Sequence, residues 1–345
     1  SSTANFASQD GLHKMGDALL KLATDERIPM AATGLGDIAA AAGRAGIHRK
    51  EIVQFSRDAA KIGVAFDLSG AQAGAAMSGL RSIFGLNQEQ AVLVADSYNH
   101  LSNNMDATAG EILRVTARAG SLGKLVGFSG QQIGALGATF LALKTPPEVT
   151  ATGINALISK LATADKQPER LAEALRTLGL SASELKRGMK DDAQGTLLSF
   201  LETVKQSDDQ IGVLADLFGA EYADDVAKLV GSLDVYKKAL KLVGKEANFA
   251  GSAQQEYEVR AKTTANDLQI LKNQAQRFAI TVGSQLLPPL KTAVSFLGHV
   301  ADVVTSVAEQ FPLLTKAVGL AAITMVGFKI AALGSRFAGT LFSDA

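Results

Sequence analysis

The chain has 345 residues, enough for several domains or for one domain with long extended helices. Its 34 Lys and Arg residues balance 34 Asp and Glu residues, which excludes the basic excess typical of proteins that bind nucleic-acid phosphates. It contains no Cys, which excludes disulfides, thiolate metal ligands and cysteine nucleophiles. The N-terminal residues have neither the charged nor the apolar region of a signal peptide, so we expect none.

The sequence predicts an all-α protein. It has no alternating runs of β-branched residues and no hairpin turn signals, whereas helix starts recur along it. Residues 1–62 form the predicted N-terminal part. Within it, residues 9–62 are expected to hold about three helices, with breaks near Pro29 and between Gly43 and Gly46.

Capping boxes predict short helices in residues 63–230. Each box pairs an N-cap Ser, Thr or Asn with a Glu or Gln three residues later, so that each side chain covers a free backbone amide. The boxes are Ser69 with Gln72, Asn87 with Gln90, Thr108 with Glu111, Ser129 with Gln132, and Ser181 with Glu184. Thr150 predicts a weaker start. The starts at 69, 87, 108, 129 and 150 are 18 or 21 residues apart, which favours a compact helical domain over a solenoid.

Residues 231–287 follow one longer period. Alternating steps of three and four residues from Leu233 to Val282 place apolar residues at 13 of 15 positions, with Gln254 at an a-type position. This seam predicts a coiled-coil-like helix, roughly 75 Å long at about 1.5 Å per residue, that self-associates. Two alternatives stay open. The seam can pack on its own domain, and the glycines at 244 and 251 can break the helix near residues 244–252.

Residues 288–345 form a predicted hydrophobic helical tail rich in small residues. Residues 317–328 carry no charge, but they are too few to cross a bilayer, which needs about 20. Gly327, Ala331, Ser335 and Gly339 fall four apart, a spacing that lets helices pack closely. We expect this face to pack against sister copies; the alternative is that it enters a membrane.

No residue pattern predicts a catalytic, cofactor or metal site. The four His residues (His13, His48, His100 and His299) lack a metal-ligand spacing, and His48 is expected at a helix start. The acidic pairs are Asp191–Asp192, Asp208–Asp209 and Asp224–Asp225. Adjacent residues on a helix point about 100° apart, so we expect no acid–base pair. The first two pairs precede apolar runs and are expected to cap helices. Gly34-Leu35-Gly36 lacks the preceding strand and the third Gly of a phosphate loop.

A set of ordered motifs resembles a known family. From Phe66 the sequence reads FDLSGAQAGAAMSGLRSIFGLNQEQAVLVADSYNHLSNN, then GEILRVTARAG, GFSGQQIGALGATFLAL, TGINALISKLA, LFGAEYADDVAKLV and NDLQILKNQAQRFAITVGSQLLPPLKTAV. In this order, over about two-thirds of the chain, these motifs resemble the core of phage tail tape-measure (minor tail) proteins. The sequence departs from the family pattern at Thr145-Pro146-Pro147, where we expect a more Gly-rich connection.

The resemblance implies a structural protein, not an enzyme, that lies in several copies along the lumen of the tail tube. Such proteins set tube length and leave during DNA ejection. The implied partners are further copies (a trimer or another tube-compatible oligomer), the tail tube protein, baseplate or tail-tip proteins, tail assembly chaperones and, in some systems, the host membrane. No cofactor and no sequence-specific nucleic acid are implied. The implied location is the virion tail-tube lumen, after assembly in the host cytoplasm. A membrane-permeabilising helical pore-former or toxin, and a cytosolic helical adaptor, stay as alternatives.

Overall fold

A computed structural model describes residues 9–281, and over that range the chain is helical with no strand, which confirms the all-α prediction there. The first helices are α1 (Gln9–Thr24), α2 (Ala32–Arg44), η2 (Arg49–Glu51), α3 (Ile52–Phe66), α4 (Gly70–Phe84), α5 (Gln88–Asn104), α6 (Ala109–Val126) and α7 (Gly130–Ala142). They are followed by α8 (Pro147–Ala162), η3 (Ala164–Lys166), α9 (Glu169–Thr177), α10 (Ala182–Asp191), α11 (Ala193–Lys205), α12 (Gln210–Phe218), α13 (Ala220–Gly231), α14 (Leu233–Val243), η4 (Glu246–Asn248) and α15 (Ser252–Arg260). Residues 264–281 are also helical.

Most predicted capping boxes are confirmed. At Ser69, Asn87, Thr108 and Ser129 both reciprocal bonds of the box are present, at the starts of α4, α5, α6 and α7. At Ser181 the side chain accepts from the Glu184 amide, as a simple N-cap of α10. These local bonds set the helix starts because they satisfy amides that have no partner within the helix.

The predicted helix start at Thr150 is wrong. Helix α8 begins at Pro147, and Thr150 lies buried in its first turn, where its Oγ1 donates to the Thr145 carbonyl. Proline suits the first position of a helix because its fixed φ is already helical and its missing N–H would have no partner there. Thr145-Pro146-Pro147 therefore forms the helix start itself.

The single long helix predicted for residues 231–287 is also wrong within the described range. The seam is divided among α14, α15 and the helical residues 264–281, with η4 and a turn between them. Gly251 has a φ of +79°, a left-handed conformation that an α-helix does not accommodate. The break therefore lies where the two glycines weaken the helix.

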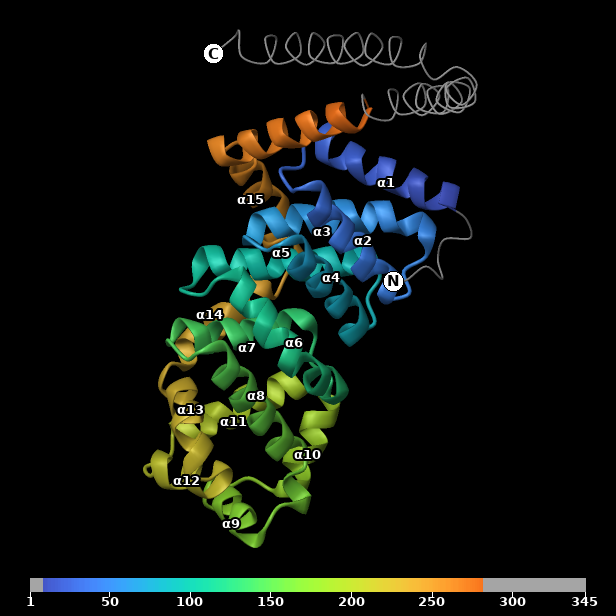
Figure 1. The fold of residues 1–345 in the computed structure, drawn as a ribbon. Helices are drawn as coiled ribbons and strands as arrows, with labels where there is room; N and C mark the ends of the chain where they lie inside the picture. The colour runs from blue at the N-terminus through green and yellow to red at the C-terminus, as the bar shows by residue number, and fades with distance from the viewer. Residues whose placement is uncertain (1–8, 282–345) are drawn as a thin grey trace, which may run out of the picture. The chain divides into compact units, whose positions relative to one another are not determined.

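The described residues up to Ala275 belong to one unit, and Gln276 begins a second. Within the first unit, α1 to α5 lie at one end, α8 to α13 at the other, and α6, α7 and α14 between them (Figure 1). One cluster of buried apolar side chains runs from Met15 to Tyr257. Helix α3 continues across residue 62 and packs against α2, α4 and α15. The predicted boundaries at residues 62, 230 and 287 stay a prediction.

Close backbone contact joins α2 to α4. A Cβ atom on Gly70 would overlap the carbonyl group of Gly34, so α4 needs a residue without a side chain at this crossing. One turn further along, an ideal Cβ on Gly74 would lie 2.9 Å from the Cβ of Ala41. Small residues thus bring α2 and α4 together here.

No helix among the described residues combines the length and apolarity that crossing a bilayer requires. The tail residues Gly327, Ala331, Ser335 and Gly339, on which the membrane hypothesis depends, lie outside the described range.

Candidate functional site

The residues that most resemble catalytic or metal-binding groups lie apart or cap helices. Within residues 9–281 no group of three His, Cys, Asp or Glu side chains could hold a metal ion. Asp192 Oδ1 accepts from the Gly195 amide and Asp209 Oδ1 from the Gly212 amide, each at 2.9 Å. These bonds confirm the prediction that the first two acidic pairs cap helices.

The remaining motifs considered in the sequence analysis also have local structural roles. His48 lies at the N-cap of η2, as predicted, and its Nδ1 accepts from the Lys50 amide at 3.4 Å. Asp224 and Asp225 both pair with Lys228, one turn further along α13. Gly34-Leu35-Gly36 lies inside α2 rather than in a loop.

A long-range polar contact instead marks the C-terminal part of the unit. We call residues 252–275, which comprise α15 and the helical residues 264–275, the strap. Asp96 of α5 accepts from the Gly251 amide at 2.8 Å and from the Ala253 amide at 2.9 Å, one bond to each carboxylate oxygen. Asn99 Nδ2 donates to the Ser252 carbonyl at 3.0 Å and to its Oγ at 2.8 Å. Helix α5 thus supplies the N-terminal cap of α15 from another part of the chain.

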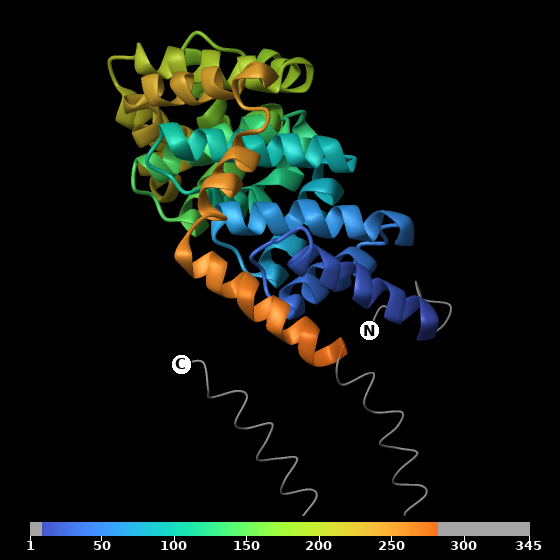
Figure 2. The same ribbon diagram turned by 90° about the horizontal axis from the view of Figure 1, so that it is seen from above.

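The Asp96 carboxyl is buried, with 3% of its surface exposed. Burial raises its pKa above the ordinary range, and the two backbone amides oppose this shift. The same face of α15 inserts Tyr257, whose ring lies 5.6 Å from the Lys61 Nζ of α3. Burial also raises the pKa of Tyr257. Helix α15 packs against α3 and α5. In Figure 2 orange segments lie beside the blue N-terminal helices.

The second helical part of the strap is attached through one face. Ile270 is buried, and the buried Asn273 donates from Nδ2 to the Met30 carbonyl at 2.9 Å. Gln269 Nε2 in turn donates to Asn273 Oδ1 at 2.8 Å. A side-chain amide thus satisfies a carbonyl in the connection between α1 and α2.

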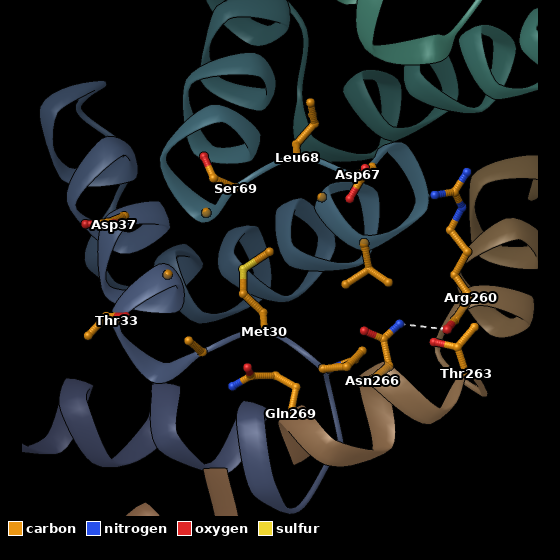
Figure 3. Close-up of a pocket in the computed structure, with 16 residues that line it drawn as sticks. Met30, Thr33, Asp37, Asp67, Leu68, Ser69, Arg260, Thr263, Asn266 and Gln269 are labelled. Atoms are coloured by element: carbon orange, nitrogen blue, oxygen red, sulfur yellow. Dashed lines mark hydrogen bonds between the residues drawn. The ribbon is translucent and has the colours of Figure 1, made fainter. Parts of the chain in front are cut away.

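Two hollows lie under the turn between the halves of the strap. The first, of about 500 Å³, lies between the α1–α2 connection, α3, α4 and the strap. Figure 3 shows Met30 pointing into it and Asn266 reaching back to the Arg260 carbonyl, at 2.7 Å. The second, of about 760 Å³, lies between α3, α4, α5 and α6, and Arg260 lines both. Their mixed lining of small apolar, amide and isolated charged groups resembles an incompletely filled packing interface rather than a catalytic cleft.

The second half of the strap exposes two large apolar seam residues to solvent. Leu268 is 62% exposed and Leu271 is 60% exposed, on the face opposite to Ile270 and Asn273. The earlier seam residues behave differently, because Leu233, Tyr236 and Val243 are buried within the unit. The predicted seam therefore packs on its own domain in α14 and at Tyr257 of α15, and its large apolar side chains in the strap are exposed only at Leu268 and Leu271, in the second half.

Sequence reasoning missed Asp96 and Asn99. The available signal was the run Asp96-Ser97-Tyr98-Asn99 in the middle of an amphipathic helix, where all four residues are buried. Buried polar side chains need partners, but the partners here follow more than 150 residues later and could not be identified from spacing.

Comparisons with known proteins identify relatives of this chain. A probable tape measure protein of Halomonas phage phiHAP-1 is 32% identical over 347 residues, which covers 95% of this chain and 40% of that relative. The chain thus corresponds to less than half of the relative's length. No solved structure matches. Residues 16–219, more than half of the chain, match the family described as phage-related minor tail proteins. The chain therefore belongs to the phage-related minor tail protein family and is a component of a phage tail.

Proposed function

We propose that the full-length protein is a tape measure that sets the length of the tail tube. The observation that carries this proposal is the 32% identity to a probable tape measure protein across 95% of the chain. In this proposal the protein occupies the tube lumen, leaves it during DNA ejection and has no catalytic role in the residues described. Its partners are the tail tube protein, baseplate or tail-tip proteins and tail assembly chaperones, and it assembles in the host cytoplasm before residing in the virion.

We assign length measurement to extended helix elsewhere in the full-length protein, not to the folded unit. In an extended helix, length grows by about 1.5 Å per residue. A compact unit that ends at Ala275 has a radius of gyration of roughly 18 Å, because this radius depends mainly on the number of residues. Several such units side by side need more width than a channel that holds one duplex. The folded unit therefore belongs outside the narrow lumen or where the assembly widens.

The exposed seam supports self-association. Leu268 and Leu271 lie on the outer face of the strap, and the sequence continues the same spacing to Phe278 and Val282. An exposed apolar stripe at heptad spacing is stabilised when sister helices cover it. A trimer, or another oligomer compatible with tube symmetry, meets this need. Membership of the phage-related minor tail protein family favours a structural tail role over the pore-former, which remained an alternative from the sequence.

Tail length tests the proposal directly. In-frame deletions of increasing size in an extended helical segment of the full-length protein should shorten tails by about 1.5 Å per residue removed, measured by electron microscopy. Deletion of α6 and α7 should abolish tail assembly instead, because it removes the middle of the folded unit. Tails of unchanged length after the first set of deletions would contradict the proposal.

A further inference from the structure

We propose that two surfaces at the α8–α13 end of the unit bind each other between two copies of this chain. The first, the basic surface, is a hollow of about 550 Å³ where α6, α8 and α10 end or pass. Lys186, Arg187 and Lys190 supply its charges, and no carboxylate from the described residues lines it. Leu125, at its edge, is 82% exposed. This surface combines positive charge with an open apolar site.

The second, the acidic surface, is a hollow of about 610 Å³ along α9, α11 and α12. Its charged residues are Glu173, Asp208, Asp209, Asp216 and Arg170. Ile211, in the first turn of the same α12, does not line the hollow but is 76% exposed. Carboxylates outnumber the single guanidinium, so this surface has the opposite sign to the basic surface.

The charges that would meet across the contact are available. Lys186 pairs with Asp165 at 2.7 Å, and Arg170 pairs with Asp216, so these four are already engaged within the chain. Among the described residues, Arg187, Lys190, Glu173 and Asp208 make no ion pair and are exposed. Two cations on one surface therefore match two carboxylates on the other.

The exposed apolar side chains of α12 and α6 lie next to well-defined helix ends. Ile211 follows the cap that Asp209 makes to Gly212, and Leu125 lies in the last turn of α6, which Gly127 ends in a left-handed conformation. Covering Ile211 with the Leu125 side chain of a second copy removes apolar surface from water on both. The charges add orientation more than affinity, since exposed ion pairs contribute little individually.

A second copy of this chain is the occupant that the charges favour. The chain has 34 cationic and 34 anionic side chains, so no net repulsion opposes the approach of like copies. Figure 1 shows α10 and α12 on opposite sides of this end of the unit. The contact therefore joins unlike surfaces, so that each copy can bind two neighbours. It uses neither Leu268 nor Leu271 and stands whether or not the protein measures tail length.

Charge exchange tests the contact. The full chain carrying Leu268→Asp and Leu271→Asp, which removes the seam, serves as the parent, and association is measured by sedimentation velocity. The parent should associate. Arg187→Glu with Lys190→Glu, and separately Glu173→Lys with Asp208→Lys, should each weaken association by at least about tenfold. An equimolar mixture of the two variants should restore it, because one keeps the acidic surface and the other keeps the basic surface.

The controls separate this contact from misfolding and from non-specific charge effects. Lys241→Glu with Lys245→Glu reverses two exposed cations outside both surfaces and should leave association unchanged. Ile211→Ser should weaken association, whereas Val149→Ser, at another exposed apolar residue, should not. A monomeric parent, variants that associate like the parent, or a mixture that stays dissociated although circular dichroism shows both variants folded would each overturn the proposal.

Discussion

At the scale of single residues, Asp96 connects parts of the chain that are far apart in sequence. Its carboxylate accepts from Gly251 and Ala253 while almost fully buried. We expect Asp96→Ala to lower the free energy of unfolding by about 2–4 kcal/mol, because it removes a cap and leaves two amides without a partner. Urea unfolding followed by circular dichroism measures the loss. Asp37→Ala, at an exposed carboxylate of α2, is the control and should change stability by less than about 0.5 kcal/mol.

The raised pKa of Asp96 predicts a pH dependence with a definite sign. Because burial raises the folded-state pKa above the unfolded value, the folded state holds the proton more tightly. The stability from this linkage is fully present below the unfolded pKa and is lost as pH rises through the folded pKa. The stability difference between the native chain and Asp96→Asn should therefore shrink as pH rises through that window. A difference that grows would show that the amide bonds outweigh burial.

The pKa of Glu26 is shifted in the opposite direction to that of Asp96. A hydrogen bond from Arg57 lowers its pKa, so its contribution is present above the unfolded pKa and fades as pH falls through the folded one. Neither shift was predictable, since Arg57 is 31 residues from Glu26 and the chain segment packed over Asp96 begins 155 residues later, at Gly251. The caps at Ser69 and Thr108 were predictable because both of their partners lie within three residues.

At the scale of helices, close packing depends on single glycines. A Cβ on Gly134 of α7 would overlap the ring of Tyr98, whose hydroxyl donates to the Gly130 carbonyl at 2.9 Å. Gly134→Ala should therefore destabilise the fold by about 1–3 kcal/mol, although alanine favours helix by about 1 kcal/mol. Gly79→Ala in α4 meets nothing within 4 Å and should stabilise by up to about 1 kcal/mol. Thermal unfolding of the two variants should shift in opposite directions.

The strap gives a second prediction for helices. Leu268→Asp with Leu271→Asp should reduce oligomer mass in light scattering, because both side chains are exposed on the seam. Val259→Asp is the matched control, since Val259 is 69% exposed but lies off the seam. If the double variant keeps the mass of the native chain, and Arg187→Glu with Lys190→Glu alone lowers it, copies associate through the basic surface and not through the seam.

The apolar period in the sequence predicts which residues share one helix face, but it does not predict what covers that face. The seam residues obey one period from Leu233 to Val282, but periodicity does not say whether the covering surface is a sister helix or the same domain. Tyr236 is buried in the unit, where its hydroxyl donates to Gln194 at 3.0 Å, whereas Leu268 is exposed. Only the placement of α7 and α5 against α14 distinguishes the two.

At the scale of the whole molecule, the folded unit either keeps its fold in the assembled tail or opens out inside the tube. The chain has no Cys, so an engineered pair can report on the fold without competition from native thiols in this region. An ideal Cβ on Gly74 lies 2.9 Å from the Ala41 Cβ. The two Cβ atoms of a disulfide are about 3.8 Å apart, so α2 and α4 need to separate by only roughly 1 Å. Ala41→Cys with Gly74→Cys therefore tests contact between these helices.

We expect this pair to form a disulfide when assembled particles carrying the full-length variant are oxidised, because we place the folded unit where the assembly is wide enough. Mass spectrometry of peptides from the particles would detect the bond. Ala41→Cys with Gly79→Cys is the control, since a side chain at Gly79 has no neighbour within 4 Å and should stay reduced. If the first pair cross-links in the purified protein but stays reduced in particles, α2 and α4 have separated during assembly. The unit would then be opened out inside the tube, and its residues would add to the measured length.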